Sequence, residues 1–543
     1  MTTLMDGDAK RGRPLRAKLM FAASAGIMAV AMPGAGVYGP QAFAQQAVPS
    51  ECSDDTTIDP STNNGNSVIN NGETIECDSD PQGSAFNGLS TTAEDLTLVF
   101  GKGGAPGATD TNTIVNDSNG ALVNIVRMDG AGDKEFQTGL NTSLEQTRAS
   151  NFAVYLRSTD GSVTIDNQGA INAGSSPGAQ NRAIRAFVRG GAGNLTINSA
   201  GTINGWVQAQ KNGQGTVDID ISDLESSAPE GGIEVKTGAL YGNILTLNVT
   251  DLTATAGNGI LILHSSELDY SNVNIRGVVS GSGSGARISG GSGAKVILDI
   301  NASLIGETSD GLFVKPDGAI ADIEVTGSGG SKIEGGTHAL NLTTIGGDIV
   351  VSDLASVSGV VGIRAISQNG TIRISNIDTI TSNNNQAIFA NTRSGSGNIS
   401  IQNVSVEPIS FDANGDPVKS GKGIYAYSGT GTINIGADPD MENSAIGNIY
   451  TNQRGIRAES NGGAISIALK GKIDAGNDGI FAQQKDDGSE ISAITVNGGG
   501  GKIEGGFRGV SLETKYGDIT VDDLASVSAG NRAEQLARGA ADQ

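Results

Sequence analysis

The sequence predicts an all-β fold, a right-handed parallel β-helix of about fourteen or more coils with about 27 residues in each. Four observations support this. Glycine is frequent, with 81 glycines in 543 residues, about twice its usual share. Only 4% of the residues are aromatic, and a phrase of four residues recurs along most of the chain. Apolar and polar residues alternate as they do in strands, without the 3.6-residue period of an amphipathic helix.

The recurring phrase is a small residue, an aliphatic residue, a variable residue, and a second small or aliphatic residue. Its clearest copies start at Gly259, Gly311, Gly362, Gly423, Gly455 and Gly479. Looser copies start at Ala153, Ala183, Gly205, Gly232, Gly285, Ala339, Ala387 and Gly509. The average spacing of about 27 residues lies in the range of solenoid repeats, in which each coil packs only on its neighbours.

Two further alternating segments follow each phrase, so each coil is predicted to hold three short strands and three turns. The narrow interior of such a coil favours modest aliphatic side chains, whose burial supplies the stability. In one coil the inward residues are predicted to be Ile363, Ala365, Ile372 and Ile374, and the outward ones Arg364, Arg373 and Asp378. Glycine or asparagine is expected at the corners, where φ is positive.

Two intervals between phrases are longer than the rest, from Ala387 to Gly423 and from Gly423 to Gly455. The extra residues, 408–416 and 436–448, predict loops that leave the solenoid at a corner. Loops of this kind often carry binding residues.

Residues 1–44 are predicted to be a signal peptide. Basic residues precede an apolar stretch from Leu19 to Met32, which is too short to cross a bilayer, and Ala42-Phe43-Ala44 has the small-x-small pattern of a cleavage site. We expect cleavage between Ala44 and Gln45 and export across the inner membrane. The segment contains five basic and two acidic residues, so its removal would change the formal net charge from −23 to −26.

Residues 45–150 are predicted to form an N-terminal cap and irregular early coils, with strand-like runs at 96–100 and 121–126. Cys52 and Cys77 are the only cysteines. Export to an oxidising compartment predicts a disulfide between them; the alternative is two free thiols too far apart to bond.

Residues 151–530 are predicted to form the regular β-helix, and residues 531–543 a non-repeating tail. The tail starts like another coil, because Asn531-Arg532-Ala533 matches Asn181-Arg182-Ala183. The residues that follow, 534–538, have the composition of a polar helix. We also expect the edge of the last coil to favour self-association, since an open strand edge can pair with another chain.

The signal peptide, the cysteine pair that follows it and the Gly-Ile-x-Ala coils together resemble the passenger region of bacterial autotransporters. The resemblance covers roughly residues 45–530. It implies a secreted right-handed β-helix that a C-terminal β-barrel delivers to the cell surface. Such a barrel would need further amphipathic strands that do not follow in this sequence, so the resemblance implies a truncated passenger. Its location would be the cell surface, the extracellular space or the periplasm.

Composition argues against several classes of function. The formal net charge of −23 disfavours nucleic acid as a partner. Two cysteines and two histidines are too few for cysteine-rich or multi-histidine metal centres. We predict no cofactor, no metal ligand and no catalytic residue. The resemblance to passengers implies a partner on a host or neighbouring cell surface, either protein or glycan, and contact with the outer membrane only through a barrel.

Three features of the sequence could belong to a catalytic site. His264 and His338 are interpreted as surface or corner residues rather than as the base of a catalytic triad. The segment 174–178 matches the Gly-x-Ser-x-Gly pattern, but it leads into a strand and not a helix, so it is interpreted as a turn. Pairs of carboxylates also occur, as in a polysaccharide hydrolase. They are Asp54 and Asp55, Asp218 and Asp220, Asp486 and Asp487, and Asp522 and Asp523.

Aromatic residues at or near the variable position of the phrase allow two interpretations. They could form an exposed ladder that binds glycans or a protein, or they could be scattered residues that pack at the surface and at corners, which the sequence favours. These residues are Trp206, Phe389, Tyr425 and Phe481. Two hypotheses follow: a structural, adhesin-like passenger, and, as the alternative, a β-helical lyase or hydrolase that degrades polysaccharide.

Overall fold

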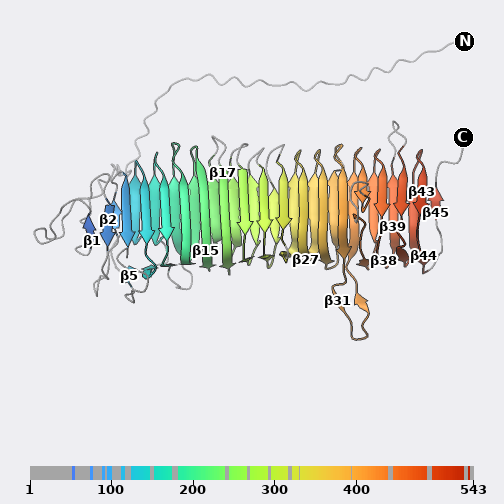
Figure 1. Ribbon diagram of the computed structural model, residues 1–543, viewed down its shortest axis with the longest axis horizontal. Helices are drawn as coiled ribbons and strands as arrows, with labels where there is room; N and C mark the ends of the chain where they lie inside the picture. The colour runs from blue at the N-terminus through green and yellow to red at the C-terminus, as the bar shows by residue number, and fades with distance from the viewer. Residues whose placement is uncertain are drawn as a thin grey trace, which may run out of the picture. The chain divides into compact units, whose positions relative to one another are not determined.

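The protein is a parallel β-solenoid of about 13 turns, as a computed structural model shows. Its strands lie side by side along one axis (Figure 1). The structure describes residues 52–54, 74–77, 89–91, 95–100, 112–116, 124–146, 152–173, 181–238, 244–265, 270–290, 295–315, 321–328, 330–392, 394–437, 444–485, 492–530 and 536–538. Of the described strands, 43 belong to one hydrogen-bonded sheet. The handedness of the solenoid stays a prediction.

The sheet folds into three faces, which we name A, B and C in the order in which the chain visits them. Face A consists of β3 (Leu89–Thr91), β6 (Val126–Gly130), β9 (Val154–Ser158), β12 (Arg182–Val188), β14 (Trp206–Lys211), β16 (Gly231–Thr237), β18 (Asn258–His264), β21 (Ala286–Gly290), β24 (Leu312–Lys315), β29 (Gln386–Thr392), β33 (Lys422–Ser428), β36 (Ile456–Ser460), β39 (Asp478–Gln484), β42 (Arg508–Glu513) and β45 (Leu536–Arg538).

Face B consists of β2 (Thr74–Cys77), β4 (Leu96–Phe100), β7 (Lys134–Thr138), β10 (Val163–Asn167), β19 (Tyr270–Ile275), β22 (Val296–Ile300), β25 (Ile323–Gly327), β34 (Ile433–Ile435), β37 (Ile465–Ala468), β40 (Ile494–Asn497) and β43 (Ile519–Asp522). Face C consists of β5 (Asn112–Asn116), β8 (Thr142–Gln146), β11 (Ala170–Ala173), β20 (Val278–Gly281), β23 (Ser303–Gly306), β35 (Ile449–Thr451), β38 (Lys472–Ala475), β41 (Lys502–Gly505) and β44 (Ser526–Ala529).

Some strands continue around a corner. Those that cross from B to C are β13 (Leu195–Asn204), β15 (Thr216–Ser226), β17 (Ile244–Ala254), β28 (Ile372–Ser382) and β30 (Ile399–Val406). The strand β26 (Lys332–Thr344) runs from C to A, and β27 (Ile349–Ser367) covers all three faces. Three short strands complete the set: β1 (Cys52–Asp54), β31 (Ser410–Phe411) and β32 (Pro417–Val418).

The repeated phrase forms face A in register, which confirms the prediction from its spacing. The aliphatic residue of one copy pairs with that of the next from Val154↔Ile184 to Ile480↔Val510. The copy predicted at Gly205 is the exception, because it is shifted by one residue and Val207, not Trp206, pairs with Ile184. Fourteen copies define thirteen steps, so the observed turns account for the predicted coils. Because the strands are parallel, each backbone N–H and C=O pairs with the coil above or below.

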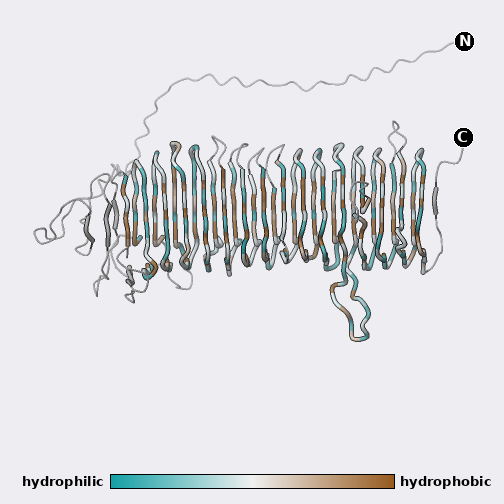
Figure 2. Tube along the Cα trace, in the orientation of Figure 1, coloured by the Kyte–Doolittle hydropathy of each residue, from teal (hydrophilic) through white to brown (hydrophobic). Residues whose placement is uncertain are grey.

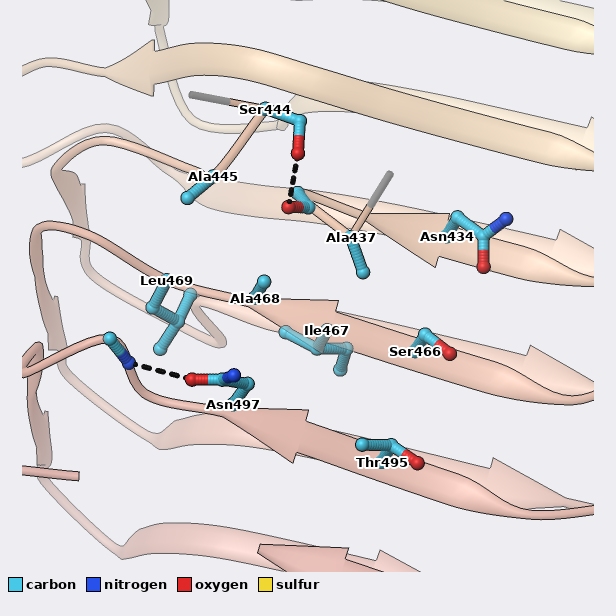
Figure 3. Close-up of a pocket in the computed structure, with 12 residues that line it drawn as sticks. Asn434, Ala437, Ser444, Ala445, Ser466, Ile467, Ala468, Leu469, Thr495 and Asn497 are labelled. Carbon is cyan, nitrogen blue, oxygen red and sulfur yellow. Dashed lines mark hydrogen bonds between the residues drawn. The ribbon is translucent and has the colours of Figure 1, made fainter. Parts of the chain in front are cut away.

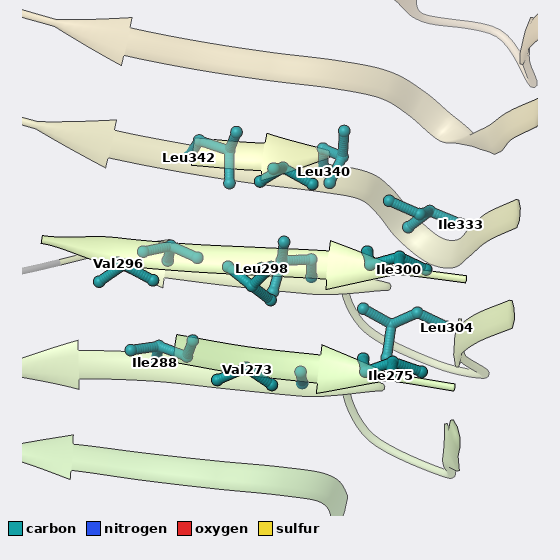
Figure 4. Close-up of a cluster of buried hydrophobic side chains, with 14 of the residues drawn as sticks. Val273, Ile275, Ile288, Val296, Leu298, Ile300, Leu304, Ile333, Leu340 and Leu342 are labelled. Carbon is teal, nitrogen blue, oxygen red and sulfur yellow. The ribbon is translucent and has the colours of Figure 1, made fainter. Parts of the chain in front are cut away.

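The core is one continuous aliphatic cluster inside the coils. Figure 2 shows the hydrophobic and hydrophilic residues alternating along the tube, and Figure 4 shows Val273, Leu298 and Leu340, which come from three different coils, in one interior. The inward assignments are confirmed, because Ile363, Ala365, Ile372 and Ile374 are completely buried. The outward ones are confirmed as well, because Arg364 is partly exposed and Arg373 and Asp378 are exposed.

The corners explain the glycine content, but not mainly in the way that the sequence predicts. At the corner that opens face A, a Cβ on Gly455 would lie 2.5 Å from Ile473 Cγ2 and 2.6 Å from the carbonyl oxygen of Gly479. No positive φ is recorded at this glycine, so close approach of the next coil selects it. Glycine is required at this position because a side chain would clash with the next coil, and not because the backbone has a positive φ.

Positive φ does occur at other corner glycines, and between faces B and C it falls on acidic and amide residues. Asp353, Asn376, Asn403 and Asp523 have φ between 44° and 61°. The side chains stack as a ladder: Asn376 Nδ2 donates to Asp353 Oδ1 at 2.9 Å, and Asn403 Nδ2 donates to Asn376 Oδ1 at 3.0 Å. Short polar side chains tolerate this conformation best. The expectation of asparagine at the corners is confirmed here.

The N-terminal coils contain the predicted strand at 96–100, which is β4. The other run, 121–126, coincides with a strand only at Val126, where β6 starts after a bend at Ile125, and residues 121–123 lie outside the described residues. Ahead of them, β1 pairs antiparallel with β2, with Cys52 opposite Cys77. Directly opposite residues of antiparallel strands lie within the Cα spacing that a disulfide needs. The backbone register therefore supports the predicted disulfide, which itself stays a prediction.

The loop predicted at 408–416 leaves the solenoid as a β-hairpin, in which β31 pairs with β32 (Figure 1). Its apolar side chains Ile409, Phe411 and Val418 are exposed. The second loop, 436–448, lies partly outside the described residues. The stack resumes after the hairpin, because Gln386 pairs with Lys422.

The helix expected at 534–538 is wrong where the structure describes the tail. Leu536–Arg538 form β45, which pairs parallel with Ser511–Glu513 of β42. The physical reason is the edge of β42, whose unpaired N–H and C=O groups are satisfied by another strand. That gain exceeds a weak helix preference in so short a segment. The described part of this chain therefore adds one more strand to face A.

Replacing Ile372 by Asp should open the coils around β28 and leave distant coils closed. An unpaired carboxylate in this interior costs several kcal/mol, and each coil stabilises only its neighbours. Hydrogen exchange should show lost protection in β25 to β30 and unchanged protection in β9 to β12. The matched control is Arg373→Asp, which faces water; equal damage from this variant would contradict the inward and outward assignment.

Replacing Gly455 by Ala should destabilise the solenoid by about 1–3 kcal/mol, because the new methyl group overpacks the corner against the next coil. Gly462→Ala is the control, since a Cβ there meets nothing closer than Thr430 Cγ2 at 3.8 Å. Thermal unfolding measures both. A Gly455→Ala variant as stable as Gly462→Ala would show that the coils can separate slightly at no cost.

Candidate functional site

The variable position of the repeated phrase points away from the core, and the register of the coils stacks it into one row along face A. The neighbour of each residue in this row is the same position of the next coil. In order, the row consists of Arg127, Tyr155, Arg185, Gln208, Glu234, Leu261, Arg287, Phe313, Asn341, Arg364, Phe389, Tyr425, Arg457, Phe481 and Ser511.

A second outward row lies two residues further along each strand. It contains Asp129, Arg157, Phe187, Gln210, Lys236, Leu263, Ser289, Lys315, Thr343, Ile366, Asn391, Tyr427, Glu459, Gln483 and Glu513. Together the two rows hold more basic than acidic residues, and they hold aromatic residues at many coils.

Face B has the opposite character among the described residues. Its outward positions carry the acids Glu135, Asp166, Asp218, Asp220, Asp299 and Glu324, with Arg373 as a basic residue. The chain carries a formal net charge of −23, yet its cations gather on face A. This separation follows from the register, because a charge placed at one position of the repeat is stacked on its equivalents.

Cations and rings alternate in contact along face A. Arg127 lies over the ring of Tyr155 at 5.3 Å, and Arg157 over Phe187 at 5.8 Å. Further along, Arg287 lies 4.4 Å from the centre of Phe313. Each such contact stabilises by roughly 0.5–1 kcal/mol at a partly exposed site.

Near the C-terminal end of face A, an aromatic group forms around Arg457. Its guanidinium lies over Tyr425, Tyr427 and Phe481 at 5.9, 5.4 and 5.7 Å. Phe389 pairs with Tyr425 across the neighbouring strands. The interpretation of these rings as scattered is therefore wrong for this group, whereas Trp206 packs separately against Phe152, at 5.7 Å between ring centroids. Aligning the copies by their variable position would have revealed the row.

Two buried carboxylates balance the cations of this group, and the sequence analysis did not identify them. Glu459 accepts from Arg457 Nε at 2.6 Å and from Lys485 Nζ at 2.8 Å. Burial alone would raise the pKa of Glu459, but these hydrogen bonds outweigh it and hold the pKa below its usual value. Asp478 accepts from Arg454 Nε at 2.8 Å. Burial raises the pKa of the Tyr425 hydroxyl nearby.

The histidines occupy corners, but neither is a simple surface residue. His264 is buried, with Nδ1 3.2 Å from Thr237 Oγ1 and Nε2 in contact with Ser271 Oγ. His338 Nδ1 lies 2.7 Å from Asp310 Oδ1. Sequence reasoning missed the second pair because its partners belong to successive coils.

Asp310 is buried and accepts three further hydrogen bonds. They come from Thr337 Oγ1 at 2.6 Å, from the His338 backbone N–H at 3.2 Å and from Asn341 Nδ2 at 3.1 Å. Burial would raise the pKa of Asp310, but the hydrogen bonds from His338, Thr337 and Asn341 lower it. Within the described residues no serine or threonine hydroxyl is bonded to Nε2 of His338. The arrangement lacks the nucleophile of a triad.

The predicted carboxylate pairs do not converge. Asp218 and Asp220 both face outward from β15, as expected, and Asp220 lies 3.6 Å from Arg276. Asp523 sits at the corner with positive φ. Segment 486–487, the turn 174–178 and the side chains of residues 54 and 55 lie outside the described residues, as does the cleavage site at Ala44 and Gln45. In the described ranges, no cluster of three or more His, Cys, Asp or Glu residues could hold a metal ion.

A cavity of about 670 Å³ opens on face B beside β34, β37 and β40 (Figure 3). Small and amide side chains line it, among them Asn434, Ser466, Thr495 and Asn497. Ser444 Oγ donates to the Gly436 carbonyl at 3.0 Å. No acidic, basic or histidine side chain is among its described lining residues. Its described lining therefore offers hydrogen-bonding groups.

Comparisons with known proteins assign the chain to no family: no family model matches it, and neither a curated protein nor a solved structure does. In the part of the chain that the structure describes, no helix is long and apolar enough to cross a membrane.

Face A ends at a corner with its own hydrogen-bonding pattern, which the sequence analysis missed. A buried hydroxyl accepts from the N–H of a glycine three residues later, at distances between 2.8 and 3.3 Å. The hydroxyls belong to Ser158, Thr344, Ser367, Ser460 and Thr514. The signal is Ser or Thr followed three residues later by Gly.

Lys211 occupies this corner position at the end of β14, in register with Val188 and Thr237. It is completely buried, and among the described residues its Nζ has no hydrogen-bond partner. Burial lowers the pKa of Lys211 to about 8. Folding thus requires either the loss of its proton or the burial of an unpaired charge.

Replacing Lys211 by Met should stabilise the protein by ~3 kcal/mol at pH 7. Between pH 8 and 10.5 the unfolded state binds more protons than the folded state, so the wild type gains stability as the pH rises. The difference between the two proteins should therefore shrink over this range. Urea unfolding followed by the fluorescence of Trp206, the only tryptophan, reports on the same strand. Lys315→Met, at an exposed lysine, is the control; an equal gain there would contradict the assignment.

Proposed function

We propose that the chain is an exported, autotransporter-like passenger with a structural and adhesive role, and that face A is its contact surface. The observation that carries the proposal is the outward row of cations and aromatic rings along successive coils of face A. Aromatic residues and arginine are the residues that dominate recognition surfaces. The signal-like N-terminus and the solenoid architecture support the exported location, on the cell surface or outside it.

A contact surface of this kind differs from an active site in how its chemistry is distributed. Its functional groups repeat over many coils and bind by adding similar contacts. An enzyme needs a few groups that converge on one reacting atom. The partner is a protein or a glycan on a host or neighbouring cell.

The alternative, a polysaccharide lyase or hydrolase, has one observation in its favour, the contact of His338 with Asp310. A carboxylate that orients a histidine is a common part of general acid–base catalysis. We favour binding because the hydroxyl of Thr337 donates its hydrogen bond to Asp310 and not to His338, and because the row of face A extends far beyond this pair.

Beads coated with the purified chain should adhere to epithelial cells or to a bacterial layer. The double variant Arg287→Glu and Lys315→Glu, which changes exposed cations of face A, should reduce the number of bound beads at least fivefold. Arg373→Glu on face B should leave it unchanged.

The same preparation, incubated with acidic and neutral polysaccharides, should release no reducing ends and no unsaturated products. Release of either would favour the enzyme. Equal adhesion of beads that carry the face A and the face B variants would overturn face A as the contact surface.

A further inference from the structure

Four arginines gather on the first described coils of face A, and we name them the arginine patch: Arg127, Arg157, Arg182 and Arg185. They come from β6, β9 and β12 and alternate with aromatic rings. Two carboxylates lie near them at the limit of an ion pair. Asp129 is 3.4 Å from Arg127 and 3.5 Å from Arg157, and Glu230 is 3.5 Å from Arg182. Among the described residues, the patch therefore holds more basic than acidic groups.

Arg185 forms the centre of this surplus. Its guanidinium lies over Phe152 at 5.7 Å and over Tyr155 at 5.5 Å. Within the described residues it has no acidic partner. A guanidinium stacked on rings keeps its edge available, with N–H groups in the fork geometry that matches a carboxylate or a sulfate.

The patch also contains polar atoms that are buried and lack a partner in the described structure. Four are donors: Nε of Arg157, Arg182 and Arg185, and Nε1 of Trp206, whose side chain is 5% exposed. Two are acceptors: Asn181 Oδ1 and Glu230 Oε2. Native proteins rarely leave buried polar groups unsatisfied. Contacts join these residues into one cluster, since Arg182 lies over Trp206 at 5.5 Å and over Phe152 at 5.4 Å.

The Arg457 group at the other end of face A provides an internal comparison. There, Glu459 and Asp478 lie within 2.6 to 2.8 Å of the cations beside them. The unpartnered buried atom in that group is an acceptor, Asp478 Oδ1. The same stacking of arginine and aromatic residues is therefore neutralised from within at one end and left with excess donors at the other.

We propose that the arginine patch binds an acidic saccharide, a sugar chain that carries carboxylate or sulfate groups. This inference rests on the proposed function and names the ligand class of its contact surface. The anionic groups would meet the guanidinium edges, and the apolar face of a sugar ring would lie against the aromatic residues. Sugar hydroxyls donate as well as accept, so they suit a cluster that offers both donors and acceptors.

The test is binding of the full chain to four immobilised polymers: polygalacturonate, dextran sulfate, neutral dextran and oligo(dT). Binding to polygalacturonate, to dextran sulfate or to both is expected, and the pattern identifies the anion. Dextran should not bind, and affinity should fall with salt. Absence of binding to both acidic polysaccharides would overturn the inference. Tightest binding to oligo(dT) would overturn it in favour of nucleic acid.

Variants locate the site. Arg185→Gln should weaken binding at least tenfold, and Arg185→Lys, which keeps the charge but loses the fork, should weaken it less. Trp206→Phe keeps a ring and removes the donor, so it should also weaken binding. Arg373→Gln on face B is the control for the loss of one charge. Wild-type affinity in Arg185→Gln and Trp206→Phe would overturn the site.

The failure of this inference can be separated from failure of the proposed function. Beads that still adhere to cells through Arg287 and Lys315, with no affinity for either acidic polysaccharide, leave face A as the contact surface and reject the saccharide. If the double variant Arg287→Glu and Lys315→Glu adheres as well as the wild type, and the wild type binds neither acidic polysaccharide, both proposals are rejected.

Discussion

The parallel hydrogen-bond ladder between coils is the constraint from which the other features follow. Each strand pairs with the equivalent strand of the next coil, residue on residue. Residues at the same position of successive repeats therefore lie next to each other, about 4.8 Å apart. An aliphatic residue at one position gives a continuous core, a glycine gives a corner, and an arginine gives a charged row. Segregation of charge between faces A and B is a direct result of this translation.

Stacking also creates a difficulty, because equal charges on adjacent coils repel. The chain avoids this repulsion along face A by alternation, since Arg127, Tyr155 and Arg185 follow one another in the row. Rings separate the cations and attract them at the same time. At Arg457 the chain adds buried acids as well. The arginine patch has no such buried acid among the described residues, so its positive charge is balanced by solvent or by a ligand. The two ends of face A therefore differ in chemistry although they share one backbone arrangement.

Much of the fold could be predicted from the sequence, because a coil is a local object and its phrase repeats. The register of face A, the inward position of Ile372 and the loop near Phe411 all follow from spacing and alternation. The contacts of the site are different in kind. Asp310 meets His338, and Glu459 meets Lys485, across intervals set by turn lengths that vary from coil to coil. The partner residues can be found in a single sequence, but their contact cannot be predicted because the length of each turn is not known from it.

Backbone pairing between coils also overrides the local preferences of single residues. Residues 534–538 have a helical composition, but Leu536–Arg538 pair with an available edge. Lys211 is polar, yet it fills a buried corner because the register leaves no other place for it. In both cases a non-local backbone pairing overrides the preference of the residue, as expected when the ladder supplies most of the order.

The β31–β32 hairpin has a consequence for engineering. The coils on either side of it pair as though nothing intervened, with Gln386 opposite Lys422, and doubling the length of such an inserted loop adds only about 0.6 kcal/mol of closure entropy. This corner is therefore a natural grafting position. An epitope, a peptide ligand or a small domain inserted between Asp412 and Asp416 would project from the solenoid without entering its core. Several such inserts, placed at equivalent corners, would be separated by a whole number of coils.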